Sequence, residues 1–259
     1  YSLANTMGVD TIHDFMKPLG FGQLTGVDLP GELRGTLPST DWKKKTYKKP
    51  EQQRWYGGET ISLGIGQGYN AFTMLQLASA TSTLANGGIY RKPRLVMATQ
   101  DPIQRLDRTV AGEEPVNLSF KTENVAVVHQ GLIGVAKVGT AARVFAGTPY
   151  QSAGKTGTAQ AVTIGQKEKY NASKLEEHQR DHALYIAFAP AENPQIALAI
   201  VVENAGFGAA QAAPIAVGDA PATTQTAVES STKPRRNADV FFETETIIRH
   251  LLEPQPVKR

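Results

Sequence analysis

Two apolar runs near the end of the chain give the clearest prediction of secondary structure. Residues 184–189 (LYIAFA) and 196–202 (IALAIVV) are almost wholly apolar and rich in β-branched and aromatic residues, which is typical of buried strands. Pro190, Asn193 and Pro194 lie between them and favour a turn. The pattern predicts two antiparallel strands joined by a hairpin connection.

Helical periodicity dominates the earlier part of the chain. Apolar and small residues recur at helical spacing over residues 73–84, and Asn86-Gly87-Gly88 follows as a stop. Asp10 and Thr122 are each expected to cap a further helix. In the second of these helices, four side chains are expected to face inward: Val125, Val128, Leu132 and Val135. Helices followed by antiparallel strands predict an α+β fold, an antiparallel sheet with helices on its faces.

Polar stretches divide the chain into three parts. Residues 1–215 carry the periodic patterns and form the predicted folded part. Residues 216–238 consist of Ala, Thr, Ser, Pro and charged residues without an apolar period, which predicts a disordered linker. Residues 239–259 regain helical spacing and predict a short C-terminal helix and tail. A shorter polar linker is expected over residues 99–121.

The stretch Lys155-Thr156-Gly157-Thr158 carries the candidate chemistry. We expect residues 152–164 to form a strand antiparallel to residues 184–189, with residues 196–202 next in the sheet. Alternation would put Lys155 and Gly157 on one face and the two threonines on the other. Gly157 leaves room for the close approach of another molecule's backbone. A cation and hydroxyls at an open strand edge suit an anionic, peptide-like ligand.

Composition narrows the class of protein only a little. The chain has 259 residues, a formal net charge of +3, a pI of about 9.0 and no cysteine, so disulfides and cysteine-based zinc sites are excluded. No apolar run reaches the length of a membrane span. The chain begins at Tyr1 without an initiator Met or a signal peptide, and we expect it to be part of a longer protein. The basic, aromatic-rich residues 42–56 favour a solvated loop, with a nucleic-acid or glycan-facing patch as the alternative.

The residues suggest three other chemistries, each with a feature against it. Gly154-Lys155-Thr156 resembles the end of a phosphate-binding loop, but Pro149 replaces the required earlier glycine and a strand is expected next. His178 and His182 have the spacing of a zinc helix, but no Glu lies between them as general base. Ser152 with Lys155, and Ser230 with Lys233, match Ser-x-x-Lys, but neither pair is expected on a helix.

Several segments together resemble the class B penicillin-binding proteins, most closely the penicillin-binding protein 2 branch that serves cell elongation. The resemblance covers about residues 1–215 and goes well beyond Lys155-Thr156-Gly157. The segments that carry it are residues 26–29 (GVDL), 58–69 (GETISLGIGQGY), 86–88 (NGG), 180–182 (RDH), 187–190 (AFAP), 193–194 (NP) and 202–204 (VEN).

The resemblance implies a partial penicillin-binding-protein or serine β-lactamase-like transpeptidase fold. It implies a peptidoglycan DD-transpeptidase that cross-links D-Ala-D-Ala stem peptides through an acyl-serine and is the target of β-lactams. Lys155 and Thr156 would hold the substrate carboxylate alongside Gly157, and Thr158 would supply its hydroxyl and an oxyanion-hole N–H. The nucleophilic serine and its lysine base are expected upstream of Tyr1, so the chain alone is expected to be inactive.

The same resemblance sets the expected surroundings of the protein. It implies membrane proteins of the elongation machinery as partners, the periplasmic face of the bacterial inner membrane as location, and neither nucleic acid, cofactor nor metal bound by this chain. The family's long terminal helix is expected to break at Gly218-Asp219-Ala220-Pro221. The competing hypothesis is a non-catalytic peptidoglycan-binding or scaffold module.

Overall fold

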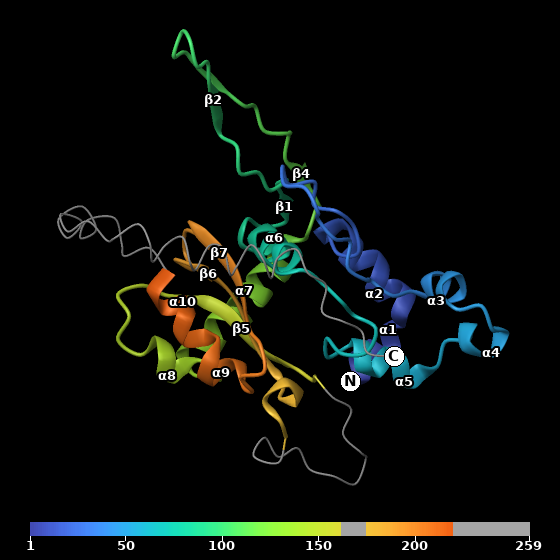
Figure 1. Cartoon of the computed structure of the whole chain (residues 1–259). Helices are drawn as coiled ribbons and strands as arrows, with labels where there is room; N and C mark the ends of the chain where they lie inside the picture. The colour runs from blue at the N-terminus through green and yellow to red at the C-terminus, as the bar shows by residue number, and fades with distance from the viewer. Residues whose placement is uncertain (162–174, 220–259) are drawn as a thin grey trace.

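The computed structural model describes residues 1–161 and 175–219 (Figure 1). The helices before the central sheet are α1 Ser2–Met7, α2 Val9–Met16, η1 Lys17–Leu19, α3 Thr40–Thr46, α4 Pro50–Gln53, α5 Gly57–Leu63, α6 Met74–Ala85, α7 Thr122–Lys137 and α8 Ala142–Phe145. Those that follow the first sheet strand are η3 Glu177–Gln179, α9 Gly208–Gln211 and α10 Ala213–Asp219. The strands are β1 Ile89–Tyr90, β2 Ala98–Gln100, β3 Asp107–Thr109, β4 Val116–Asn117, β5 Ala153–Ala159, β6 His182–Ala189 and β7 Ile196–Val202.

The central sheet has the order β5-β6-β7, with both pairs antiparallel. This confirms the predicted hairpin of residues 184–189 and 196–202 and the position of the Lys-Thr-Gly strand beside it. Strand β5 ends at Ala159, so Gln160 and Ala161 are not part of it, contrary to the expected end at residue 164. The remaining residues of that prediction, 162–164, lie outside the described residues.

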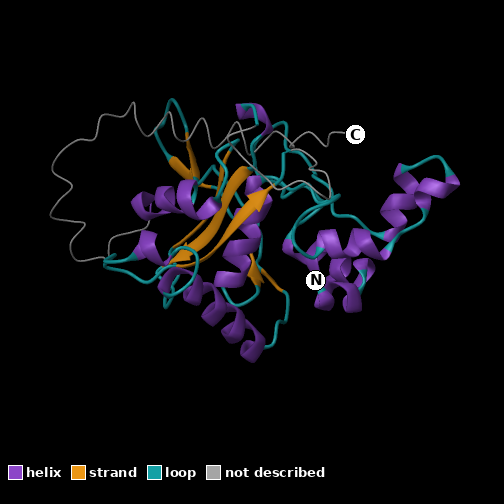
Figure 2. Ribbon diagram, turned by 90° about the horizontal axis from the view of Figure 1, so that it is seen from below, coloured by secondary structure: helices purple, strands orange, loops and turns teal. Residues whose placement is uncertain are grey.

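Helices cover both faces of this sheet (Figure 2). On one face, Ala183, Tyr185 and Ala187 of β6 pack against α8, α9 and α10 in a core that includes Phe145. On the other face, Phe188 packs with Ala153 against residues of α6 and α7. Alternate side chains of β6 therefore pack into two different hydrophobic cores. The α+β prediction, an antiparallel sheet with helices on its faces, is confirmed.

The helix predictions are confirmed for α6 and α7 and need correction at single residues. Thr73 caps α6 through a hydrogen bond from Gln76 N to its Oγ1 (3.2 Å). Helix α2 begins at Val9 with Gly8 as its N-cap, so Asp10 lies inside the first turn; its carboxylate accepts instead from Thr40. Helix α7 begins at Thr122 with Lys121 as its N-cap, and Val128 is exposed rather than inward.

The expected polar linker over residues 99–121 contains strands instead. β2 pairs with β3 and β4 pairs with β1, both antiparallel, and the β2–β3 hairpin projects away from the sheet (Figure 1). Local pairing thus gives structure to a segment whose composition carries no apolar period.

The C-terminal boundary also shifts. Helix α10 continues through Gly218 to Asp219, so residues 216–219 belong to the fold and not to a linker. The other half of the expected break, Ala220-Pro221, lies outside the described residues. A helix can include a glycine when its neighbours are packed, here Ala213 and Ala216. The rest of the predicted linker, residues 220–238, and the predicted terminal helix and tail, residues 239–259, lie outside the described residues.

Candidate functional site

Strand β5 carries the candidate site on its outer edge. Its inner edge pairs with β6, from Ala153 opposite Phe188 to Ala159 opposite His182. In the part of the chain that the structure describes, no strand pairs with the outer edge. Alternate residues of an antiparallel strand direct both backbone groups to the same edge. The hydrogen bonds of Thr156 and Thr158 described below place these two residues on the outward set, which leaves their backbone N–H groups at the open edge.

Lys155 and Thr156 lie next to each other with different surroundings. Lys155 is exposed, and its Nζ donates to the Thr156 carbonyl oxygen (2.7 Å). The Thr156 hydroxyl is hydrogen-bonded to the hydroxyl of Thr140 (2.8 Å), which lies between α7 and α8. The register puts Lys155 opposite Ile186 and Thr156 opposite Tyr185, so the two side chains leave opposite faces of the strand, as the alternation predicts.

Gly154 is required by the packing of Tyr185. A Cβ at Gly154 would lie 2.5 Å from Tyr185 Oη and 2.5 Å from the Ile186 carbonyl oxygen, closer than such atoms can approach. Tyr185 is fully buried, and its burial raises the pKa of the phenol to about 12, with the nearby Ser152 acting in the opposite direction. The phenol therefore stays neutral at physiological pH, and its ring packs against β5 at Gly154.

The close backbone approach at Gly157 comes from the chain itself. A Cβ added to Gly208, the first residue of α9, would fall well inside contact distance of the carbonyl oxygens of Gly157 and Leu184. Helix α9 thus lies against the Gly157 backbone, whereas a Cβ at Gly157 itself would lie nearest Leu184 (3.3 Å). The room expected beside Gly157 for another molecule's backbone stays a prediction. Gly208 was not identified from the sequence.

The glycine-dense segment after α5 reaches the same strand. Gln67 Nε2 donates to the Thr158 carbonyl oxygen (3.0 Å) across 91 residues of sequence. The segment belongs to the motifs that carried the family resemblance, but no role for Gln67 followed from its residues. The only local signal was the glycine spacing, which indicates a tight turn and does not indicate what the turn contacts.

Lys43 corrects the prediction of a solvated basic loop. Residues 40–46 and 50–53 are helices α3 and α4, and Lys43 is 3% exposed. Its Nζ makes an ion pair with Glu59 Oε1 and lies 5.4–5.5 Å from the ring centroids of Trp55, Tyr56 and Tyr69. Two aromatic residues of this segment and Tyr69 thus enclose one of its cations, which is favourable for a desolvated charge.

Glu59 joins this cluster to helix α5. It accepts from Tyr69 Oη (2.9 Å) and from the backbone N–H of Tyr56 (2.9 Å), the N-cap of α5. Burial raises the pKa of Glu59, but the hydrogen bonds from Lys43, Tyr56 and Tyr69 outweigh it and hold the pKa below its ordinary value. Burial and the hydrogen bond to Glu59 raise the pKa of the Tyr69 phenol.

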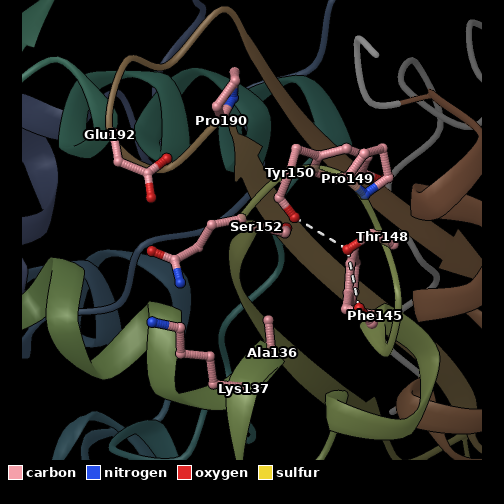
Figure 3. Close-up of a pocket in the computed structure, with 10 residues that line it drawn as sticks. Ala136, Lys137, Phe145, Thr148, Pro149, Tyr150, Ser152, Pro190 and Glu192 are labelled. Carbon is pink, nitrogen blue, oxygen red and sulfur yellow. Dashed lines mark hydrogen bonds between the residues drawn. The ribbon is translucent and has the colours of Figure 1, made fainter. Parts of the chain in front are cut away.

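A cavity of about 410 Å³ lies beside Ser152, the residue that precedes β5 (Figure 3). Ser152 lines it together with Phe145, Tyr150, Pro190 and other residues, and Ser152 is 3% exposed. With the Gln151 amide oriented to satisfy its neighbours, its nitrogen donates to Glu192 (2.8 Å) and its oxygen accepts from Lys137 (2.6 Å). Lys155 does not line this cavity.

The alternative chemistries do not assemble. Lys155 and Thr156 lie within a strand and not before a helix, which contradicts a phosphate-binding loop. His178 belongs to η3 and His182 to β6, and His182 Nδ1 accepts from the Asn204 N–H (3.0 Å), so the two are not on one zinc helix. Ser152 precedes β5, and Lys155 Nζ is bonded to a carbonyl oxygen. Ser230 and Lys233 lie outside the described residues.

The sheet, the helices on its two faces and Lys-Thr-Gly on its edge strand together define a transpeptidase-type fold. A comparison with protein families agrees: residues 1–217 match the family described as the penicillin binding protein transpeptidase domain. The chain belongs to the penicillin-binding protein transpeptidase family.

Known relatives narrow the similarity further. The chain is 41% identical over 212 residues to the peptidoglycan D,D-transpeptidase MrdA of Escherichia coli strain K12, covering 81% of this chain and 33% of that protein. The Acinetobacter baumannii MrdA is 42% identical over 213 residues, covering 82% and 31%. The chain therefore spans about a third of the length of these relatives.

Solved structures give the same result. The Pseudomonas aeruginosa PBP2 in complex with WCK 5153 matches with a TM-score of 0.69 at 39% identity, covering 85% of this chain and 43% of that one. The Helicobacter pylori PBP2, solved as a complex with MreC, matches with a TM-score of 0.68 at 28% identity, covering 84% and 36%. The predicted resemblance to the penicillin-binding protein 2 branch is confirmed.

Proposed function

We propose that this chain is the C-terminal part of a peptidoglycan DD-transpeptidase of cell-wall elongation. In this reaction a serine attacks the carbonyl of the penultimate D-Ala of a stem peptide, the terminal D-Ala leaves, and an amine of a neighbouring strand then takes the acyl group from the serine. The open outer edge of β5 is the observation that carries the proposal, because an extended peptide can add to it as a further strand.

The strand supplies four groups to this reaction, from Lys155, Thr156 and Thr158. The Lys155 side chain leaves the other face from that of Thr156, but its ammonium reaches the outer edge, where it donates to the Thr156 carbonyl oxygen. There this ammonium and the Thr156 hydroxyl bind the terminal carboxylate of the peptide or the carboxylate of a β-lactam. Gly157 keeps this stretch of the strand free of a side chain. Thr158 offers its outward N–H to the developing oxyanion and its hydroxyl to the ligand. The nucleophilic serine and its lysine base are supplied by a segment upstream of Tyr1.

The surroundings proposed for the chain follow from its relatives. The H. pylori PBP2 that it resembles was solved with MreC, and we propose that this protein likewise works with membrane-associated elongation proteins at the periplasmic face of the inner membrane. Residues 1–161 and 175–219 contain no helix long and apolar enough to cross a membrane.

A hybrid enzyme tests the proposal. The matching C-terminal region of the E. coli MrdA is replaced by this chain, and the purified hybrid is incubated with a fluorescent penicillin and analysed by denaturing electrophoresis and mass spectrometry. We expect an adduct on the serine of the upstream Ser-x-x-Lys segment. A hybrid that melts cooperatively but acquires no label would contradict the proposal and favour a non-catalytic peptidoglycan-binding or scaffold module.

A further inference from the structure

The end of β5 is held by a side chain from a distant loop. Thr158 and Ala159 form the last pairs of this strand with β6, opposite Ala183 and His182. Strand ends with an unpaired edge fray readily because few hydrogen bonds fix them. At this point Gln67 Nε2 donates to the Thr158 carbonyl oxygen (3.0 Å) from the unpaired side, so Thr158 is held from outside the sheet.

The loop that presents Gln67 is itself fixed. Gly66 and Gly68 have φ values of 77° and 75°, which other residues rarely adopt. The Gln67 N–H donates to the Ser62 carbonyl oxygen (3.0 Å) and the Gly66 N–H to that of Leu63 (2.9 Å). These bonds seat the Gln67 backbone on the last turn of α5, so its side chain starts from a defined position.

Both flanks of the loop lead to the buried ion pair. On one side, α5 begins with the capping box in which Glu59 accepts from the Tyr56 N–H. On the other side, Tyr69 donates to the same Glu59 (2.9 Å). Lys43 neutralises this carboxylate from α3. The loop is therefore clamped at Glu59 from two directions, and Gln67 lies between the two attachments.

We infer that Gln67 is a positioning residue for the edge strand: it fixes the Thr158 carbonyl. Because the carbonyl and N–H of an extended residue in such a strand face the same edge, this holds the strand in the conformation that directs the Thr158 N–H outward. This inference rests on the proposed function, in which that N–H faces the oxyanion. Gln67 itself does not touch the reacting atoms. A carbonyl oxygen has two lone pairs, so an incoming peptide N–H can bind Thr158 while Gln67 stays in place.

The hydrogen bond from Gln67 to the Thr158 carbonyl oxygen is called the tether below. Hydrogen exchange on the 259-residue chain tests it directly. Gln67→Asn shortens the side chain by one methylene, and Gln67→Glu keeps its length but removes the donor. Gln130, exposed on α7, provides matched controls as Gln130→Asn and Gln130→Glu. The N–H groups of Gly157 and Ala159 point toward β6, and we expect both Gln67 variants to lower their protection roughly three- to ten-fold, as for the loss of one hydrogen bond. Protection equal to that of the controls would overturn the tether.

Acylation of the hybrid enzyme tests whether the Gln67–Thr158 hydrogen bond affects catalysis. With the tether lost, we expect the rate constant of serine acylation by penicillin to fall roughly ten-fold, while the dissociation constant of the noncovalent complex changes less, because the oxyanion forms only in the transition state. Loss of affinity with an unchanged rate constant, or no change in either, would overturn the positioning role. A wild-type hybrid without any acylation would contradict the proposed function instead. The hydrogen-exchange experiment would then be the test of whether Gln67 holds the Thr158 carbonyl.

Discussion

The effect of Lys155 on acylation can be measured separately from its effect on the stability of the fold. It is exposed at the strand edge, and its Nζ donates to a neighbouring backbone oxygen, so it contributes little to stability. We predict that Lys155→Ala in the hybrid enzyme slows acylation about 10²–10³-fold and changes the free energy of unfolding by less than about 0.5 kcal/mol. Rate measurements and urea unfolding check the two parts.

Lys45→Ala is the matched control for this variant. Lys45 is exposed on α3, away from β5, and its removal should leave both acylation and stability unchanged. If Lys155→Ala and Lys45→Ala reduce acylation equally, the carboxylate-binding role proposed for Lys155 is wrong.

Lys43, unlike Lys155, is a cation that stabilises the fold. Its side chain is 4% exposed and that of its partner Glu59 is 22% exposed. Removal of one member of a buried pair costs about 3–5 kcal/mol. Glu59 is partly exposed and keeps two other donors, so we predict that Lys43→Ala lowers the free energy of unfolding by about 2 kcal/mol. Denaturant unfolding of the chain measures this, and a loss no larger than that of the exposed Lys44→Ala would show that the pair stabilises nothing.

The same pair predicts how stability depends on pH. The pKa of Glu59 lies below its ordinary value of 4.5, so the folded chain binds fewer protons than the unfolded chain in that range, and stability rises with pH there. The contribution is complete above pH 4.5 and is lost as pH falls through the lower, folded-state pKa. We expect Glu59→Gln to be less stable than the wild type at pH 7, with the difference shrinking below pH 4.5. A difference that stays constant to pH 3 in urea unfolding would contradict this.

At the scale of elements, the packing of α9 on the sheet depends on one missing side chain. Gly208 lies against the carbonyl oxygens of Gly157 and Leu184 with no room for a Cβ. We predict that Gly208→Ala lowers the free energy of unfolding by about 2 kcal/mol or more, because backbone atoms must move to admit the methyl group. Thermal unfolding measures this loss.

Gly131→Ala provides the comparison. Gly131 lies in α7 with open space where its Cβ would be, so alanine should stabilise the chain by about 0.5–1 kcal/mol through helix propensity. Equal effects of the two substitutions would mean that α9 does not pack tightly on β5 and β6.

At the scale of the whole molecule, the proposed site needs more than this chain. Acylation requires a serine, a base and two oxyanion donors held together, whereas the groups proposed on β5 are those that bind the carboxylate and one oxyanion donor. We predict that the 259-residue chain alone is not labelled covalently by a fluorescent penicillin under conditions in which the hybrid enzyme is labelled. A stoichiometric adduct on Ser152 or Ser230, found by mass spectrometry, would contradict both this prediction and the upstream position of the nucleophile.

The sequence by itself determined the elements whose cause is local. Residues 196–202 are a strand because seven consecutive apolar residues follow a turn, and α6 begins at its Thr73 cap because the capping box lies within four residues. The same local patterns predicted the position of the Lys-Thr-Gly strand in the sheet. The matched motifs indicated the family.

Only the tertiary structure decided which distant groups meet. Lys43 belongs to a basic run that composition assigns to solvent, yet two aromatic rings of that run enclose it together with Glu59 and Tyr69 from the following segment. Gln67 reaches Thr158 across 91 residues, and Gly208 closes over Gly157. Burial and backbone approach of this kind depend on how helices and strands pack together, and residue spacing within one segment carries no information about the segment that will cover it.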